Sequence, residues 1–193
     1  MLIIESCGSK TPCCDLPTGC SYLTPLTTNY CSVQDELVAA AQKFRDLKIP
    51  VDNFVQDWQY WGDLGWGPQW DTNYYQDPPA MVKTLKEESI NLMVSVWSRF
   101  DDNTKFYKEM DEKNFLINDA DYYDAWNAEA RELFYSYSKG AMFDIGVDAL
   151  WLDATEPENF PNENQTVALG SGNAYWNTFS LMTTQAISDG LRR

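Results

Sequence analysis

Three short strand candidates recur along the chain, and each ends on a polar or aromatic residue. They cover residues 51–57, 92–97 and 147–153. The third is largely apolar, which is typical of a strand that is buried on both faces of a sheet. After the third run comes Thr-Glu-Pro-Glu, and Pro157 places the strand boundary just after Asp153, because proline cannot continue a central strand. The pattern therefore predicts three strands, the last of which presents a carboxylate at its end.

Amphipathic segments separate these runs. A first helix is expected after Ser32, which starts a capping-box pattern, and it should end before Pro50. A second begins at Asp77, which is followed by proline. Apolar residues at three-and-four spacing predict a helix over 121–139, and a last helix opens at Gly172. Strands that alternate with helices indicate a parallel sheet with right-handed crossovers.

Two stretches fall outside this alternation of strands and helices. Residues 1–31 contain all five cysteines together with many Thr, Pro, Ser and Gly residues, so we expect an irregular segment there. Residues 99–118 form a long charged insertion. The regular part, residues 32–193, contains too few strands for a closed barrel, which predicts a piece of a larger α/β domain.

Composition narrows the chemistry. The formal net charge of −15 argues against binding to nucleic acid or to an anionic membrane surface, and no apolar run is long enough for a membrane span. The chain has no histidine, which excludes Ser-His-Asp and Cys-His catalysis and histidine-ligated metals. Acid–base chemistry would therefore rest on carboxylates, with tyrosine or lysine as lesser candidates.

The ends of the three predicted strands carry Asp57, Trp97 and Asp153. Ligands and catalytic groups gather at the carboxyl ends of parallel strands, so these side chains are expected at one rim of the sheet. An aromatic loop over residues 58–71, with four tryptophans among glycines, is expected to wall one side of a cleft. A lone strand-end aspartate is as often a solvated carboxylate as a functional one, but three such strand ends favour a site.

Five motifs in this order are similar to glycoside hydrolase family 31, and to its α-xylosidase-like branch more than to its α-glucosidases. They are Val55-Gln56-Asp57-Trp58-Gln59-Tyr60-Trp61, Trp66-Gly67-Pro68-Gln69-Trp70-Asp71, Val94-Ser95-Val96-Trp97, Asp124-Ala125-Trp126-Asn127-Ala128-Glu129-Ala130-Arg131 and Trp151-Leu152-Asp153-Ala154-Thr155-Glu156-Pro157-Glu158. The resemblance implies an α/β chain that is part of a (β/α)8 TIM barrel, here about three β-α units. It also implies hydrolysis of terminal α-linked sugars in oligosaccharides or glycosides with retention, without a metal or organic cofactor.

The resemblance also implies a role for each matching residue. Asp153 matches the nucleophile that forms a covalent glycosyl-enzyme, and Asp57 matches the aspartate that hydrogen-bonds sugar hydroxyls. Trp97 and Trp151 match aromatic residues of the same subsite, and Glu156 matches an acidic residue that orients the nucleophile. Retention requires two carboxyl groups roughly 5–5.5 Å apart, one attacking and one protonating the leaving oxygen.

The sequence departs from the family pattern in two places. The family's general acid/base lies on a later strand, beyond Arg193, and residues 1–31 do not match the first barrel strand. We therefore expect a fragment that is inactive when isolated. Asp71, Glu156 and Glu158 are possible substitute acids, but their spacing supports none of them. A non-catalytic sugar-binding module and a fragment without function remain alternatives.

Overall fold

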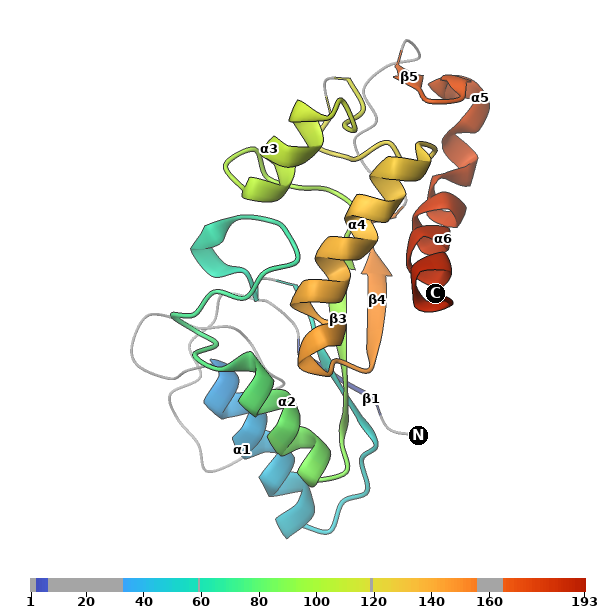
Figure 1. The fold of residues 1–193 in the computed structure, drawn as a ribbon. Helices are drawn as coiled ribbons and strands as arrows, with labels where there is room; N and C mark the ends of the chain where they lie inside the picture. Colours follow the sequence, from blue (N-terminus) through green and yellow to red (C-terminus); the bar gives the residue numbers. More distant parts are fainter. Residues whose placement is uncertain (1–2, 7–32, 59, 119, 156–164) are drawn as a thin grey trace. The chain divides into compact units, whose positions relative to one another are not determined.

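The computed structural model describes residues 3–6, 33–58, 60–118, 120–155 and 165–193, whose helices and strands are drawn in Figure 1. The chain divides into two compact units. Unit 1 comprises Met1–Asp63, Gln69–Ser95 and Ala141–Trp151, and unit 2 comprises Leu64–Pro68, Val96–Gly140 and Leu152–Arg193. Each unit is thus assembled from separate stretches of chain.

The main sheet has four strands in the order β1-β2-β3-β4. Their bounds are Ile3–Ser6 for β1, Asn53–Gln56 for β2, Asn91–Trp97 for β3 and Ala149–Asp153 for β4. Strand β2 pairs in parallel with both β1 and β3, with Gln56 opposite Val94. The three strands expected at 51–57, 92–97 and 147–153 are confirmed as the neighbours β2, β3 and β4, and the parallel pairing is confirmed for β2 and β3.

Strand β1 corrects one expectation. Residues 1–31 were expected to be irregular throughout, yet Ile3–Ser6 pairs along its whole length with β2. A four-residue strand carries too little pattern to stand out beside a Cys-, Pro- and Thr-rich stretch. Residues 1–2 and 7–32, including Ser32 of the expected capping box, lie outside the described residues.

Helices α1 (Val33–Asp46) and α2 (Pro78–Glu87) lie side by side in unit 1 (Figure 1). The rings of Phe44 in α1 and Phe54 in β2 pack edge to face at 5.8 Å, which places α1 against the sheet. The Asp77 side chain accepts the Ala80 N–H at 3.0 Å, so the predicted start of α2 is confirmed. Met81, Val82 and Leu85 form its buried face. A short 3-10 turn, η1 (Gly62–Leu64), lies between β2 and α2 in the sequence, and a second, η2 (Phe143–Ile145), lies between α4 and β4.

Unit 2 is mostly helical. Its elements are α3 (Lys105–Glu112), α4 (Ala128–Ala141, whose last residue belongs to unit 1), β5 (Thr166–Val167), β6 (Gly170–Ser171), α5 (Gly172–Tyr175), η3 (Trp176–Thr178) and α6 (Phe179–Leu191). Strands β5 and β6 form a small antiparallel hairpin. At the core the Tyr123 and Phe134 rings stack at 4.7 Å, and the Tyr123 and Thr183 hydroxyls lie 2.6 Å apart. These contacts join the start of α4 to α6.

Two helix predictions in unit 2 need correction, and one helix was not predicted. The charged insertion contains the unpredicted helix α3, which Thr104 caps by accepting the Tyr107 N–H. The helix expected over 121–139 begins only at Ala128, because Asn127 caps it by accepting the N–H groups of Glu129 and Ala130. Tyr122 and Tyr123 sit in β-bridges instead. The helix expected from Gly172 is interrupted at η3, and Phe179, Thr183 and Ile187 of α6 are buried.

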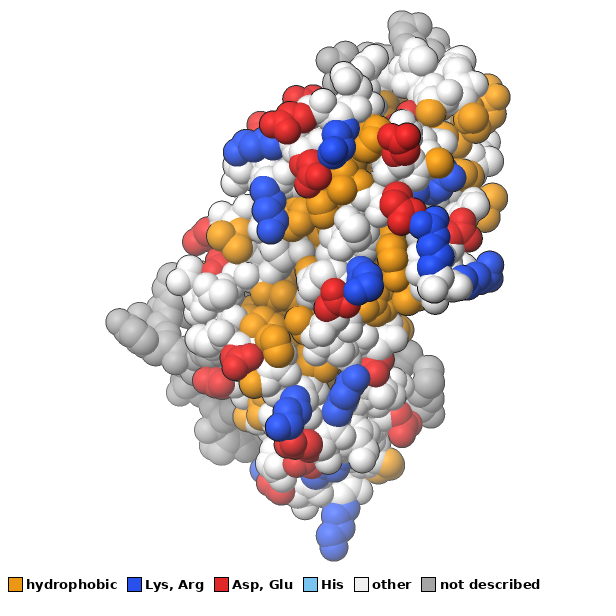
Figure 2. Space-filling model, in the orientation of Figure 1, with side chains coloured by type: hydrophobic (Ala, Val, Ile, Leu, Met, Phe, Trp, Pro, Cys, Tyr) orange, Lys and Arg blue, Asp and Glu red, His pale blue; other side chains and the backbone are white. Residues whose placement is uncertain are grey.

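Surface charge is mixed in sign. On the face that Figure 2 shows, lysine and arginine side chains are interspersed with acidic ones rather than gathered in a basic patch. Among the described helices none is both long and apolar enough to cross a membrane.

Candidate active site

Asp57 directly follows β2, whose last three residues are buried. Its side chain is 8 % exposed and accepts the Trp58 N–H at 2.8 Å, and its carbonyl oxygen accepts the Gln56 side-chain amide at 3.1 Å. Because β2 and β3 are parallel and Gln56 is opposite Val94, Asp57 lies at the same end of unit 1's sheet as Ser95. The carboxylate is thus held at the carboxyl end of a buried strand, as the sequence predicts.

The aromatic loop after β2 is largely a core in unit 1. Tyr60 lies 4.9 Å from both Trp61 and Trp70, measured between ring centroids, and Trp70 lies 4.9 Å from Tyr75. The Trp70 indole N–H donates to the Ala141 carbonyl at 2.9 Å. Burial raises the pKa of the Tyr60 and Tyr75 hydroxyls, so both stay protonated at neutral pH. These rings stabilise the loop. Trp61 is buried, whereas Trp58, Trp66 and Trp70 are half-buried, so the expected cleft wall is only partly interior.

Asp71, one of the possible substitute acids, has a structural role in this loop. It is 1 % exposed, and its two carboxylate oxygens accept the N–H groups of Asn73 at 2.9 Å and Asp63 at 3.2 Å. Its own N–H donates to the Tyr60 carbonyl at 2.9 Å. A carboxylate engaged in this way closes a turn, which agrees with the weak support that its spacing gave it as an acid.

Trp97, the last residue of β3, meets Trp66 of the aromatic loop within unit 2. Their ring centroids are 4.2 Å apart and the ring planes are perpendicular at 89°. The Arg99 guanidinium carbon lies 3.7 Å from the Trp66 ring centroid, and Arg99 is paired with Asp121. Both indoles are half-buried. We call Trp66, Trp97 and Arg99 the tryptophan corner.

Asp153 is the last residue of β4 and is half-buried. Trp151 is half-buried in the same strand, and because side chains alternate along a strand, residues 151 and 153 share a face. Ala154 follows with φ +51°, so the chain turns sharply through a left-handed conformation right after the carboxylate. The Thr155 carbonyl then accepts the Ser180 hydroxyl at 2.9 Å, which ties this turn to α6. Glu156 and Glu158 lie outside the described residues.

Asp124 fixes the chain that follows. One oxygen accepts the Ala168 N–H at 2.7 Å and the other accepts the Trp126 N–H at 3.0 Å. Burial raises the pKa of Asp124, and these backbone donors partly offset the shift. Asp124 therefore joins the start of α4 to the hairpin β5-β6 inside unit 2.

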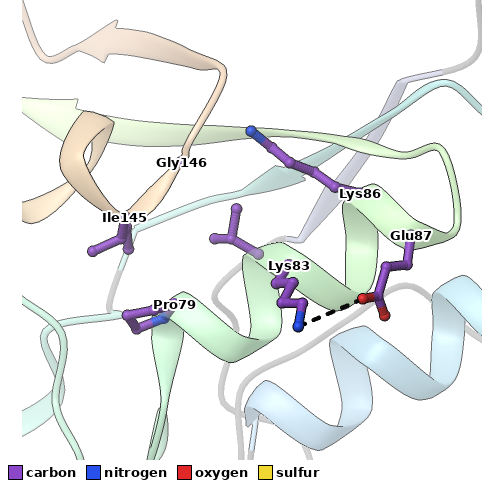
Figure 3. A pocket seen from close by; sticks show the side chains of 7 residues that line it. Pro79, Lys83, Lys86, Glu87, Ile145 and Gly146 are labelled. Atoms are coloured by element: carbon purple, nitrogen blue, oxygen red, sulfur yellow. Dashed lines mark ion pairs between the residues drawn. The ribbon is translucent and has the colours of Figure 1, made fainter.

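Two surface grooves lie away from all of these residues. One, of about 450 Å³, lies between α2 and the turn at Gly146 (Figure 3). Its lysines are engaged, because Lys83 pairs with Glu87 at 3.8 Å and Lys86 pairs with Asp148 at 3.3 Å. The other, of about 470 Å³, lies beside α4 and includes Leu133. Among the described residues, no cluster of three Cys, Asp or Glu side chains could hold a metal ion.

Sequence reasoning missed Arg99 and Asp121. Arg99 fell within the charged insertion, and only its position two residues after a strand-end tryptophan set it apart. Asp121 was placed in a helix that begins later. The two side chains pair across 22 residues of sequence, next to a backbone β-bridge between Arg99 and Tyr122. No local periodicity in the sequence indicates such a contact.

The fold is an α/β fold in which Asp57 directly follows β2, Trp97 ends β3 and Asp153 ends β4. Residues 21–193 match the model of the glycosyl hydrolases family 31 TIM-barrel domain. The chain belongs to glycoside hydrolase family 31, and its sheet is part of that family's TIM barrel.

Similar proteins agree with this assignment. The chain is 37 % identical over 168 residues to an α-xylosidase of Saccharolobus solfataricus, a match that covers 83 % of this chain and 23 % of that protein. A crystal structure of a family 31 α-xylosidase from a soil metagenome, complexed with xylose, superposes with a TM-score of 0.76 at 30 % identity and covers 82 % of this chain and 26 % of the other. The corresponding enzyme of Xanthomonas citri gives a TM-score of 0.72 at 30 % identity, over 82 % and 20 % of the two chains. This chain thus spans about a quarter of the length of the curated α-xylosidase.

Proposed function

We propose that this chain carries the nucleophile-bearing part of a retaining α-glycosidase that acts on α-xylosides. The position of Asp153 supports this proposal most strongly, because it ends β4 in a chain that belongs to glycoside hydrolase family 31. The choice of xylose over glucose is supported by the motifs of the α-xylosidase-like branch and by the similarity to α-xylosidases.

Asp153 acts as the nucleophile in this proposal. A carboxylate oxygen forms a bond to the anomeric carbon, and the bond from that carbon to the leaving oxygen breaks with its electron pair. Water then cleaves the glycosyl ester and restores the carboxylate. Asp57 hydrogen-bonds the hydroxyls of the sugar, and Trp97 and Trp151 cover the apolar face of the sugar ring. Glu156 orients the nucleophile.

The leaving oxygen needs a proton, and no residue of the 193 matches the family's general acid/base. Positioned acid catalysis is typically worth about 10²–10⁴-fold in rate. The 193-residue chain should therefore hydrolyse unactivated xylosides very slowly, while a glycosyl fluoride, whose leaving group needs no proton, should still react with Asp153.

Mass spectrometry after incubation with a 5-fluoro xylosyl fluoride tests this proposal. One fluoroxylosyl group should appear on the peptide that contains Asp153, and Asp153→Asn should remove it. Asp71→Asn is the matched control, and that variant should still be labelled. A label on a different carboxylate, or brisk turnover of unactivated xylosides, would overturn the assigned roles.

A specific observation also favours sugar binding without catalysis. Perpendicular, half-exposed indoles such as Trp66 and Trp97 offer an apolar surface to a pyranose ring. Calorimetric titration with xylose tests binding apart from chemistry. Xylose binding with no label on Asp153 would support a binding module.

A further inference from the structure

Arg99 is stacked between two aromatic rings in unit 2. Its guanidinium carbon lies 3.7 Å from the Trp66 ring centroid and 5.6 Å from that of Tyr122. The side chain is only 19 % exposed, so water screens these contacts weakly. A planar guanidinium lies flat against an indole in a way that the ammonium group of lysine cannot.

An ion pair and backbone contacts fix the orientation of the Arg99 guanidinium. Arg99 pairs with Asp121, and the backbone of Arg99 bridges to Tyr122, the next residue. The Phe100 N–H donates to the Asp121 carbonyl at 2.9 Å. Because both partners of the ion pair sit on bridged backbone, the guanidinium has little freedom to leave the Trp66 face.

The Trp66 backbone is held as well. Its N–H donates to an Asp101 carboxylate oxygen at 3.0 Å, and its carbonyl accepts the Asp101 N–H at 3.1 Å. The flanking glycines permit this close approach. A Cβ at Gly65, whose φ is +87°, would lie 2.5 Å from the Asn103 side-chain oxygen, and one at Gly67 would lie 2.5 Å from a ring carbon of Phe106.

The Arg99 guanidinium packs on the Trp66 ring, and the Trp66 ring in turn meets Trp97 at 4.2 Å and 89°. A continuous set of contacts thus runs from Asp121 through Arg99 and Trp66 to Trp97.

We propose that Arg99 is a positioning residue for sugar binding, which holds Trp66 against Trp97 so that Trp97 presents a fixed ring to a pyranose. This inference rests on the proposed function, because Trp97 is assigned there to the sugar subsite. Arg99 itself need not touch the sugar. A residue of this kind changes affinity for the sugar more than the rate of the chemical step.

The test measures labelling of Asp153 by the 5-fluoro xylosyl fluoride as a function of reagent concentration, in wild type and in Arg99→Lys. The lysine variant keeps the charge but loses the planar stack. We expect the half-saturating concentration to rise about tenfold while the rate at saturation stays within about twofold. Arg131→Lys is the matched control in unit 2, because Arg131 donates to the Ala125 carbonyl, which lies outside the tryptophan corner.

Two further measurements separate positioning from general stability. Fluorine NMR of the fluorotryptophan-labelled chain should show a shifted Trp97 resonance in Arg99→Lys, assigned through Trp97→Phe, and no shift in Arg131→Lys. Trp97→Phe should weaken labelling in the wild-type chain and add little in the Arg99→Lys chain, because residues that act through one another are not additive.

The outcomes distinguish the two proposals. If wild type labels Asp153 and Arg99→Lys shows the wild-type half-saturating concentration, positioning by Arg99 is wrong and the proposed function stands. If Arg99→Lys and Arg131→Lys weaken labelling equally, the effect is one of stability and the inference also fails. If wild type neither binds xylose nor labels Asp153, the proposed function fails and takes the inference with it.

Discussion

The aromatic rings of unit 1 in the loop after β2 and the tryptophans of unit 2 have different surroundings. In unit 1, Tyr60 and Trp61 are 1 % and 3 % exposed, and their neighbours are other rings. In unit 2, Trp66 and Trp97 are half-buried, and Arg99 lies against Trp66. The first set has the character of a core, and the second has the character of a surface built to meet a ligand.

This difference shows that aromatic content alone does not locate a sugar site. The four tryptophans of residues 58–71 look alike in the sequence, yet only Trp66 belongs to unit 2 and to the tryptophan corner. The guanidinium on the Trp66 ring separates it from Trp61, which is buried, whereas partial exposure does not, because Trp58 and Trp70 are half-buried as well.

The largest loss of stability is expected on substitution of Trp61. We expect Trp61→Ala to lower the free energy of unfolding by about 3–5 kcal/mol, because the buried indole leaves a cavity among packed rings. Urea unfolding measures the loss. Trp97→Ala should lower stability less and should weaken xylose binding. If Trp61→Ala and Trp97→Ala lost the same free energy of unfolding, the tryptophan corner would be part of the hydrophobic core.

The dependence of stability on alkaline pH also tests whether the rings of unit 1 form a buried core. An unfolded tyrosine titrates near pH 10, and burial raises the pKa of Tyr60 above that value in the folded chain. The folded state keeps the proton that the unfolded state releases, so this contribution is constant below pH 10 and falls above it by about 1.4 kcal/mol per pH unit. Tyr60→Phe should make stability fall less steeply above pH 10, as followed by urea unfolding at several pH values. Tyr74→Phe, at a half-buried position, is the control, and an equal effect there would contradict the account.

Asp71 tests whether the loop in unit 1 depends on buried hydrogen bonds as well as on rings. Asp71→Asn leaves only one side-chain acceptor for the N–H groups of Asp63 and Asn73, at a cost of about 1–3 kcal/mol in unfolding free energy. Asp52→Asn, at an exposed position, should change stability by no more than about 0.5 kcal/mol. Equal losses in the two variants in thermal or urea unfolding would count against a structural role for Asp71.

The smallest effect is expected at Ala154. Its φ of +51° is left-handed, where glycine has no Cβ to clash, so Ala154→Gly should raise the free energy of unfolding by about 1 kcal/mol at most. Ala154→Val should lower it, because a β-branched side chain fits this conformation worst. A glycine variant less stable than wild type in urea unfolding would show that the turn carries no strain.

The sequence was most informative where a local signal agreed with the tertiary structure. The apolar runs gave β2, β3 and β4 to within two residues at either end, and Asp77 followed by proline marked the start of α2. It failed where two signals competed. Tyr122 and Tyr123 have helical spacing with the residues that follow, yet Asn127 caps the helix after them.

The candidate site divides in the same way. Asp57 and Asp153 were placed at strand ends from pattern alone, and the structure has them there. The roles that the resemblance gives them stay proposals. The tryptophan corner could not have been predicted, because Trp66 and Arg99 lie far apart in the sequence and, like Arg99 and its partner Asp121, meet only through tertiary contacts.

The assembly of unit 2 from three stretches of chain has a consequence for folding. The hydrogen bond from Trp66 to Asp101 closes a loop of 35 residues, and that from Trp126 to Thr178 spans 52. Contacts of such separation carry a larger loop-closure entropy and form more slowly than local ones. During synthesis Tyr60 meets Trp70 after ten further residues, whereas Trp66 waits for the end of β3 and the turn beyond it. The rings that stabilise unit 1 should therefore be in place before the tryptophan corner closes.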